Sequence, residues 1–461
     1  MNNAVNTDPN VKADVYYAPW EKSFDKILTP FEEFIHRQTT SGFLLICMTV
    51  LALVLANGPL AAAYQHLLHT LISVNIGGWG LEMTLHHWVN DGLMTLFFFV
   101  VGLELKRELL VGELATPRNA VLPIAAAAGG MVVPALIYFA FNPQGDAAAG
   151  WGIPMATDIA FAIGALALLA GRVPKALVTF LVALAIVDDL GAVMVIAIFY
   201  TDTIALAPLA VTGGFFAMLL AFNLAGIRNF IPYFIVAVFM WYALQQSGVH
   251  ATLAGIIGAF SVPAKPKYDP ARFSAHVKEL MRRFDASHKP DKSIMTNVEL
   301  RAVVQTLENG VHSVEAPLQR LEHIWHMPVA YLVIPIFALA NAGIPLDFGS
   351  LGETLTHPVM LGVSLGLILG KFVGITGVCW LVLKLDVAAL PKDTRFTQIA
   401  GVSLLAGIGF TMSIFVAQLG FGGHEDLLLT AKTGILAASL LAGVAGFIWL
   451  YVVSKPVKAE G

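Results

Sequence analysis

Charged residues are scarce in this chain: they make up only 13% of its 461 residues, whereas 57% of the residues are hydrophobic. A water-soluble protein carries roughly 25% charged residues, because it needs them to cover its surface against water. The mean hydropathy of +0.74 points the same way. The composition therefore excludes a soluble protein and indicates a polytopic membrane protein, in which each helical span takes about 20 apolar residues.

The sequence also lacks the features of several other protein classes. Two cysteines occur, Cys47 and Cys379, and both lie in apolar segments, which excludes a disulfide framework. The net charge of −4 does not indicate a nucleic-acid partner. No HExxH or CxxC pattern is present, and LILGKF lacks the first glycine and the final Ser or Thr of a phosphate-binding loop. We therefore expect no cofactor.

Apolar stretches of membrane-spanning length follow one another along most of the chain. We predict an all-α polytopic membrane protein with twelve transmembrane helices, since a helix satisfies every backbone polar group within its own segment. The predicted spans are residues 41–66, 86–106, 119–141, 147–170, 175–200, 203–225, 229–246, 250–263, 327–343, 358–384, 396–419 and 429–453. The polar N-terminal segment lacks the apolar core and cleavage site of a signal peptide, so we expect insertion to begin with the first span.

The distribution of lysine and arginine predicts the orientation of the spans. Of the 27 such residues, all except Lys371 and Lys432 lie in the N-terminal tail, in alternate loops or in the C-terminal tail. Because these residues mark the cytoplasmic side, an even number of spans places both termini in the cytoplasm. The resulting division is a cytoplasmic tail at 1–40, helices I–VIII at 41–263, a cytoplasmic insert at 264–326, helices IX–XII at 327–453 and a cytoplasmic tail at 454–461.

Three segments outside the spans carry local structural signals. Thr29 as N-cap and Pro30 at the first helical position predict a short amphipathic helix on the inner membrane surface. The insert is predicted to form two or three short helices, with loops at SHKPDKS and ENG. Residues with β propensity flank Gly77 and Gly78, which predicts a β-hairpin in an outer loop.

Four ionisable residues lie near the middle of their predicted spans: Asp158, Asp188, Asp189 and Lys371. Each costs roughly 2.5–3.5 kcal/mol at that depth, so such residues are rare within spans. We interpret the aspartates as functional; a buried structural ion pair is the alternative. Neighbouring residues on a helix point about 100° apart, so Asp188 and Asp189 cannot both face Lys371. We expect one aspartate to pair with the lysine and the other to face a cavity.

Carboxylates crowded into a poorly solvated site are suited to exchange chemistry. They cannot all ionise easily, and protons therefore bind to them. A hard monovalent cation such as Na⁺ would also bind these oxygens, with help from the Thr157 hydroxyl or from backbone carbonyls. A proton and Na⁺ would then compete for one site, which is the minimum that an exchanger requires.

Two spans contain residues that interrupt helices. The fourth begins GWGIPMATDIAF, and the eleventh reads AGVSLLAGIGFTMSIF. Paired interruptions in the two halves of a transporter point to a midplane binding site, with half-helix N-termini suited to Asp158 and C-termini suited to Lys371. The alternative is that glycine is simply common in membrane helices. In the tenth span, glycines every four residues from Gly362 to Gly374 predict close helix packing.

Ionisable residues near the span ends allow two interpretations. Asp91, Glu104 and Glu108 flank the second span and are interpreted as solvated interface residues. The alternative is a pH-sensing cluster with Lys106 and Arg107. Asp91 lies towards the outer interface and is a candidate for an outer funnel. His250, at the start of the short eighth span, is either a packed interfacial histidine or a proton sensor.

Five segments carry a family resemblance: ATDIAFAIGALALL, ALAIVDDLGAV, SGVHATLAG, VAYLVIPIFALANAGI and AGIGFTMSIF. They closely resemble the NhaA family of bacterial sodium/proton antiporters, and the likeness covers about residues 41–453 except an insert at 264–320. It implies twelve helices in inverted-topology repeats, with interrupted and crossing helices IV and XI. It also implies electrogenic exchange of Na⁺ or Li⁺ for protons across the bacterial inner membrane, activated at alkaline pH, for sodium and pH homeostasis.

The resemblance also implies roles for individual residues. Asp189 is similar to the principal cation-binding carboxylate of the family, and Asp188 to the carboxylate that pairs with the tenth-helix lysine, here Lys371. Thr157 and Asp158 match the residues at the helix crossing. The hairpin near Gly77-Gly78 resembles a dimer contact, which implies a homodimer in membrane lipid. The residues in motifs that the family associates with pH regulation are Glu104, Arg107, Glu108 and Glu322.

Two other functions compete with the antiporter. An intramembrane aspartyl protease needs a GxGD segment, but before Gly145-Asp146 the position of the first glycine is occupied by Pro143. A lysine at the midplane would also prevent two aspartates from sharing one proton. A passive cation channel predicts conductance without proton coupling and does not explain the paired interruptions. We therefore expect a secondary active transporter and not an enzyme.

Overall fold

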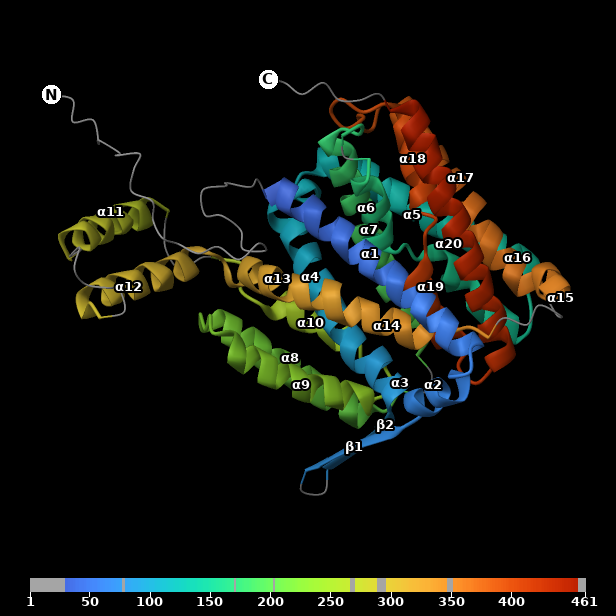
Figure 1. Cartoon of the computed structure of the whole chain (residues 1–461), viewed down its shortest axis with the longest axis horizontal. Coiled ribbons are helices and arrows are strands. Elements are labelled where there is room, and N and C mark those ends of the chain that lie inside the picture. The colour runs from blue at the N-terminus through green and yellow to red at the C-terminus, as the bar shows by residue number, and fades with distance from the viewer. Residues whose placement is uncertain are drawn as a thin grey trace.

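The computed structural model describes residues 30–76, 79–169, 171–201, 204–265, 270–287, 296–345 and 351–454. These residues form a bundle of helices with one two-stranded β-hairpin (Figure 1). By length and composition, eight helices within them can cross a membrane, or nine when one bent pair counts as a single span. The predicted helical, polytopic architecture is confirmed, whereas the number twelve stays a prediction.

The helices and strands follow one another along the two halves of the chain. The first half contains α1 (Pro30–Asn57), α2 (Ala61–Leu68), β1 (Leu71–Ile76), β2 (Trp79–Thr84), α3 (Leu85–His87), α4 (Met94–Val111), α5 (Pro117–Phe141), α6 (Ile159–Ala167), α7 (Lys175–Phe199), α8 (Leu206–Leu224), α9 (Phe230–Gln245) and α10 (Leu253–Ser261). The second half contains α11 (Pro270–Ser287), α12 (Val298–Val314), α13 (Pro317–Pro328), α14 (Ile334–Asn341), α15 (Leu351–Thr356), α16 (Pro358–Leu365), α17 (Lys371–Lys384), α18 (Phe396–Leu405), α19 (Phe410–Gly420) and α20 (Glu425–Val453). Short π-helical segments join α3 to α4 (Trp88–Leu93), α13 to α14 (Val329–Val333) and α16 to α17 (Gly366–Gly370).

Large apolar side chains cover the outside of the bundle. On α8, for example, Leu206 is 77% exposed and Leu224 is 89% exposed. Extended apolar surface of this kind is unfavourable in water, and lipid covers it in membrane proteins. The chain is therefore a multi-pass membrane protein.

Helix α1 differs from its prediction in extent. It begins at Pro30, as the sequence indicates, but it continues without a break to Asn57. No proline lies between Pro30 and Asn57, so nothing in the polar stretch ends the helix. The predicted surface helix and the predicted first span are therefore parts of one helix. This helix ends at Asn57 and not at residue 66, because Gly58 and Pro59 follow.

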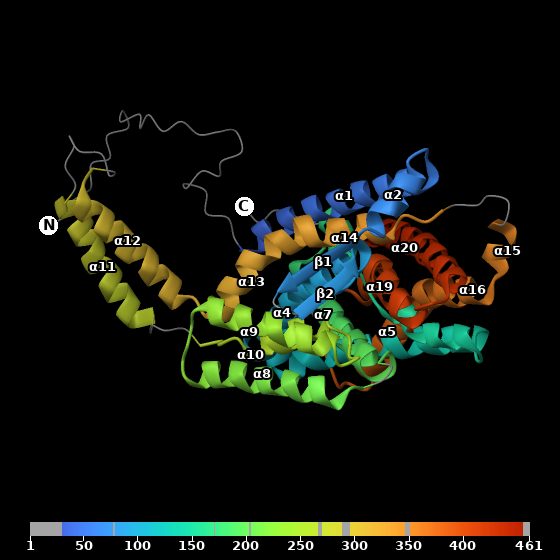
Figure 2. The same ribbon diagram turned by 90° about the horizontal axis from the view of Figure 1, so that it is seen from below.

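The insert contains a helical hairpin that projects to one side of the bundle (Figures 1 and 2). Helices α11 and α12 account for two of the predicted short helices. The predicted loop at ENG is wrong: residues 308–310 lie inside α12, where Gly310 leaves room for the Phe273 ring of α11. Most of the predicted SHKPDKS loop lies outside the described residues. Helix α13, which continues into the predicted ninth span, begins at Pro317 and not at residue 327.

The predicted β-hairpin is confirmed. Strands β1 and β2 pair antiparallel with Ile76 opposite Trp79, which leaves residues 77 and 78 between the strands and outside the described part of the chain. Figure 1 shows the hairpin at one end of the bundle, beside α2 and α3. We call this end the hairpin side. Because α3 follows β2 directly, the second span begins at the hairpin side and runs away from it.

Both predicted helix interruptions are present. In the fourth span, a 3-10 segment (Asp146–Met155) is followed by residues 156–158 and then by α6. In the eleventh span, α18 and α19 are separated by residues 406–409 and bent by 50°. The backbone N–H of Asp158 donates to the carbonyl of Ile408 at 2.6 Å, so the two interruptions contact each other. The ends of several half-helices therefore meet at one place inside the bundle.

The glycines of the tenth span make the close packing that their spacing predicts. Helix α17 lies against α5, where a Cβ atom at Gly374 would overlap the carbonyl of Gly129. One turn earlier on α17, Lys371 is completely buried, and its side chain lies beside Gly130. Close backbone approach thus places a lysine ammonium in the core of the bundle.

We expect the Gly374→Ala variant to be less stable than the parent, because its methyl group would overlap the Gly129 carbonyl. Overpacking of this kind costs about 1–3 kcal/mol. Gly377→Ala is the matched control, since a Cβ atom at Gly377 meets nothing within 4 Å. Thermal unfolding in detergent should give a lower midpoint for Gly374→Ala and an unchanged one for Gly377→Ala. Equal midpoints for the two variants would show that the contact does not limit packing.

Candidate ion-binding site

A buried ion pair joins α7 to α17. The Lys371 Nζ atom lies 2.5 Å from Asp188 Oδ2, and both side chains are almost fully buried. The Thr157 hydroxyl donates to the same Asp188 oxygen at 2.6 Å and also lies 2.9 Å from the carbonyl oxygen of Ala406. A hydroxyl has one proton, so Thr157 can satisfy only one of these acceptors at a time. This arrangement leaves Asp188 Oδ1 buried without a hydrogen-bond partner.

Asp189 has a different environment from its neighbour. Its side chain is 0% exposed, and neither carboxylate oxygen has a hydrogen-bond partner. The predicted division of roles is therefore found, since Asp188 pairs with Lys371 and Asp189 does not. We expected Asp189 to face a cavity. Asp189 does not line the pocket of about 640 Å³ that leads to Asp158 and is described below. Unpaired buried carboxylate oxygens are costly, so this group needs a proton or a cation.

Asp158 links the two interrupted spans. Its Oδ1 atom accepts the backbone N–H of Phe161 at 3.0 Å, which caps the start of α6. Its Oδ2 atom accepts the backbone N–H of Thr411 at 3.0 Å and also the Thr411 hydroxyl, at the start of α19. The carboxylate thus lies at the positive ends of two half-helices, as predicted.

Lys371 bonds to a carboxylate, and its predicted place at the negative end of a half-helix stays a prediction. Lys371 donates to Asp188, and the Thr157 hydroxyl is the group that lies against the carbonyl end of α18, at Ala406. A carboxylate attracts the ammonium more strongly than the partial charge of a helix end does, and a buried ammonium needs full compensation.

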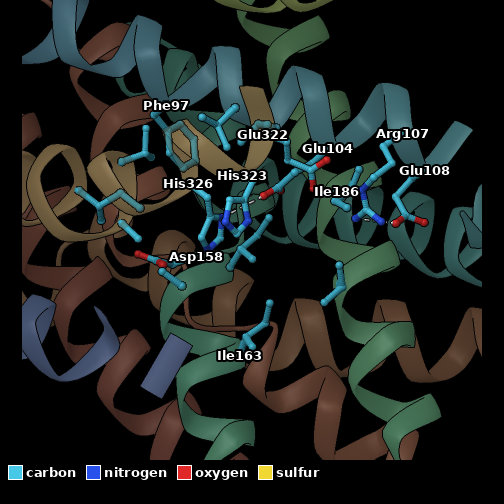
Figure 3. Close-up of a pocket in the computed structure, with 18 of the residues that line it drawn as sticks. Phe97, Glu104, Arg107, Glu108, Asp158, Ile163, Ile186, Glu322, His323 and His326 are labelled. Atoms are coloured by element: carbon cyan, nitrogen blue, oxygen red, sulfur yellow. Dashed lines mark hydrogen bonds and ion pairs between the residues drawn. The ribbon is translucent and has the colours of Figure 1, made fainter. Parts of the chain in front are cut away.

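The large pocket has a volume of about 640 Å³ and leads to Asp158 (Figure 3). Asp158 lies at one end of it, and Arg107 and Glu108, near the end of α4, lie at the other. Thr411, which also lines the pocket, is hydrogen-bonded to Asp158. Because α4 runs away from the hairpin, the far end of the pocket lies away from the hairpin side. The other polar residues that line it are Glu104, Thr179, Glu315, Gln319, Glu322, His323 and His326.

Ion pairs connect the side chains of this pocket. Arg107 lies 3.0 Å from Glu322 through Nε and 3.0 Å from Glu108 through Nη2. Glu104 lies 3.5 Å from Nδ1 of His326. The four residues predicted from pH-associated motifs are therefore neighbours in the structure. His326 was not among the residues predicted from the sequence, although its spacing of four residues from Glu322 places both on one face of α13.

His250 and Asp91 lie apart from this cluster. The Nε2 atom of His250 is 2.6 Å from the carbonyl oxygen of Tyr200, which fits the interpretation of a packed interfacial histidine. Asp91 accepts a hydrogen bond of 3.4 Å from Gln245, near the hairpin end of the second span. Neither residue lines the large pocket, so His250 is not a member of the Glu104 and Arg107 cluster.

The three aspartates do not form a closed metal cage. Among the residues that the structure describes, no three His, Cys, Asp or Glu side chains are arranged to hold one metal ion. A cation at Asp189 would thus take its remaining ligands from hydroxyl, carbonyl or water oxygens. Incomplete coordination of this kind suits an ion that must bind and leave.

A helical membrane bundle with buried aspartates, a buried lysine and two contacting helix interruptions has the architecture of a secondary transporter. The chain belongs to the Na⁺/H⁺ antiporter 1 family, whose model matches residues 32–450. The resemblance inferred from the sequence motifs is thereby confirmed.

Curated relatives match almost the whole chain. The chain is 56% identical over 432 residues to Na(+)/H(+) antiporter NhaA 1 of Saccharophagus degradans, which covers 94% of this chain and 93% of the relative. It is 52% identical over 439 residues to Na(+)/H(+) antiporter NhaA of Sulfurimonas denitrificans, covering 95% and 99%. It is 48% identical over 442 residues to Na(+)/H(+) antiporter NhaA of Dichelobacter nodosus, covering 96% and 95%.

Proposed function

We propose that this chain is an electrogenic antiporter of the bacterial inner membrane, which expels Na⁺ or Li⁺ in exchange for protons. The observation that carries the proposal is the Asp189 carboxylate, which is fully buried with both oxygens unpartnered. Such a group is stable only with a proton or a cation bound to it. Binding of either ion at one carboxylate is the chemistry that exchange requires. The family membership supports the same ions.

The proposed architecture has twelve spans in inverted repeats, with crossing helices IV and XI. The contact between Asp158 and Thr411 supports the crossing, because it joins the two interruptions. The distribution of lysine and arginine supports cytoplasmic termini and an outward-facing hairpin side. We also propose that the hairpin forms the contact of a homodimer in the lipid bilayer.

The proposed transport cycle begins on the cytoplasmic side, where the large pocket gives access to Asp158. Loss of a proton from Asp189 at alkaline cytoplasmic pH lets Na⁺ bind there, with Asp188 and Thr157 as further oxygen ligands. A conformational change then exposes the ion to the outside, where a proton replaces it. If one Na⁺ displaces more than one proton, each net charge contributes about 2.3 kcal/mol per 100 mV of membrane potential.

Na⁺-evoked dissipation of a pH gradient in proteoliposomes tests this function. The account predicts that Na⁺ and Li⁺ dissipate the gradient, that choline does not, and that an imposed membrane potential changes the rate. Protein-free liposomes control for leakage. A correctly folded protein that gives no Na⁺ response at any pH would contradict the proposal.

We further propose that the Glu104, Arg107, Glu108 and Glu322 cluster sets the pH at which transport begins, for sodium and alkaline pH homeostasis. We expect the Glu322→Gln variant to shift the pH profile of exchange towards acid. Removing one negative charge lowers the proton affinity of the remaining acidic groups, so they lose their protons at a lower pH.

The expected shift in the pH midpoint is about one unit or less, the usual effect of one neighbouring charge. Glu279→Gln is the matched control, because Glu279 lies in solvent on α11, outside the pocket. The rate of Na⁺-evoked exchange measured across pH checks this. An unchanged profile in Glu322→Gln, or an equal shift in Glu279→Gln, would remove the cluster from pH control.

A further inference from the structure

A second polar cluster lies on the hairpin side, at a distance from the aspartates. His86 Nε2 is 2.9 Å from Asn341 Oδ1, and Asn341 donates to Asn90 Oδ1 at 2.8 Å. Gln418 donates to the same Asn341 oxygen, while its own carbonyl oxygen is buried without a hydrogen-bond partner. Lys432 lies near enough to interact electrostatically with His86. We call these five residues the hairpin-side cluster.

The cluster joins four spans that meet at one end of the bundle. His86 follows β2 and opens the second span, and Asn341 ends α14. Gln418 lies near the end of α19, and Lys432 lies near the start of α20. At 1.5 Å per residue, Gln418 is about 10 Å along α19 from Thr411, which contacts Asp158. The cluster therefore lies between the aspartate site and the hairpin side.

The hairpin-side cluster and the large pocket lie on opposite sides of the aspartates. The large pocket reaches Asp158 from the side away from the hairpin. Release of an ion on the hairpin side requires the spans that now meet there to separate. The hydrogen bonds through Asn341 hold the second and ninth spans against the eleventh, so they oppose that separation.

Protonation of His86 would change how it fits its neighbours. Its Nε2 atom lies 2.9 Å from Asn341 Oδ1, which can only accept, and 3.3 Å from the amide nitrogen of Gln418. The amide nitrogen of Asn90 lies 3.4 Å from both ring nitrogens, so the neutral ring can accept from one of these amides. With a hydrogen on each nitrogen the ring can accept from neither, and it would face the amide hydrogens of Asn90 and Gln418 as a second donor.

A proton on His86 would also add like charge to an already cationic contact. The titratable groups that act on His86 are Lys432 from α20, His69 from the end of α2 and the adjacent His87. The nearby carboxylate, Asp91, instead accepts from Gln245 of α9. Two or more positive charges at one partly buried contact repel each other strongly.

We propose that the hairpin-side cluster is a latch that keeps the outside closed, and that a proton from outside on His86 releases it. This inference rests on the proposed function for its direction, since the hairpin side is then the side from which protons enter. A lower external pH would raise the fraction of protein that is open to the outside. Na⁺ would then be released on the side where the proton concentration is higher. The latch would thus couple external pH to the conformational step.

Labelling of a buried reporter cysteine measures opening without relying on transport. Ala342, which follows Asn341, is 0% exposed, so Ala342→Cys reports separation of the spans. The two native cysteines are replaced (Cys47→Ser, Cys379→Ala). Right-side-out membrane vesicles receive a membrane-impermeant thiol reagent at external pH from about 8 to about 4, which extends below the ordinary histidine range because repulsion from Lys432 opposes a proton on His86.

Because a thiol reacts as its thiolate, each labelling rate is divided by the rate for the unfolded protein at the same pH. We expect this relative rate to rise about tenfold as the external pH falls across this range. His86→Gln keeps a hydrogen-bond donor for Asn341 but cannot gain a charge, so its labelling should stay low at every pH. Lys432→Met removes the repulsion and should reduce the pH response. His424→Gln is the matched control and should behave as the parent, because His424 pairs with Asp146 and is not among the groups that act on His86.

A His86→Gln variant with the same pH response as the parent would overturn the latch. Labelling that ignores external pH in the parent would overturn it as well. Na⁺-evoked exchange is measured in parallel on the same variants. If labelling follows the prediction but neither the parent nor any variant exchanges Na⁺, the proposed function fails and the latch stands. If the parent exchanges Na⁺ but labelling does not follow the prediction, only the latch fails.

Discussion

The Asp189→Asn variant is expected to lose Na⁺-evoked proton exchange while remaining folded. Asparagine has nearly the same shape, but it is neutral, so it neither binds a proton nor attracts a cation. Loss of one partner from a buried charge pair costs about 2–5 kcal/mol, which lowers Na⁺ affinity by about thirtyfold or more. Since both oxygens of Asp189 are buried without partners, the neutral variant should be at least as stable as the parent.

The pH-gradient assay in proteoliposomes, combined with thermal unfolding, checks this prediction. Asp146→Asn is the matched control: Asp146 is a largely exposed aspartate that pairs at 3.2 Å with His424 outside the site. We expect the control to exchange Na⁺ as the parent does. A folded Asp189→Asn variant that still exchanges would keep the function but move the ion to Asp158 or Asp188.

Removing Lys371 alone is expected to destabilise the protein strongly. In Lys371→Met the Asp188 carboxylate would be buried with no cation, and breaking a buried ion pair in this way costs about 3–5 kcal/mol. The double variant Asp188→Asn with Lys371→Met should recover most of that stability, because no buried charge is then left unpaired. The side-chain oxygen of the introduced asparagine would still accept the Thr157 hydroxyl.

Thermal unfolding of the parent, the two single variants and the double variant measures this coupling. The exposed pair of Glu279 and Arg282 supplies the control. Hydrogen bonds from Arg282 and Arg283 lower the pKa of Glu279 to about 2, yet Glu279→Gln should change the midpoint little, because solvent screens surface pairs. If the effects of the Asp188 and Lys371 substitutions simply add, the pair is not coupled and the geometry of the site is wrong.

The sequence was sufficient to find the aspartates, the lysine and the helix interruptions, for a physical reason. Charge at the middle of a span is unfavourable in lipid, so it stands out against an apolar background. Glycine and proline are common in membrane helices, but clusters of them in one span of each half of the chain stand out as a pair. The different directions of Asp188 and Asp189, about 100° apart, follow from helix geometry alone. The close packing at Gly374 follows from the four-residue spacing of glycines.

The contacts between distant segments could not be predicted in the same way. Asp158 bonds to Thr411, 253 residues away, and Thr157 lies against Ala406, because the two interruptions meet in space. The local sequence of each segment does not show which distant segment it will contact. Likewise, Gln418 and Asn341 look like ordinary polar residues until the fold places them beside His86.

Na⁺ binding to the purified protein, measured by titration calorimetry across pH, tests the central claim most directly. If Na⁺ and a proton compete at Asp189, the apparent Kd for Na⁺ should rise about tenfold for each unit of pH below the titration of the site, and binding should release protons. Asp189→Asn should show no such binding. A Kd that does not depend on pH, or an Asp189→Asn variant that binds Na⁺ as the parent does, would contradict the account.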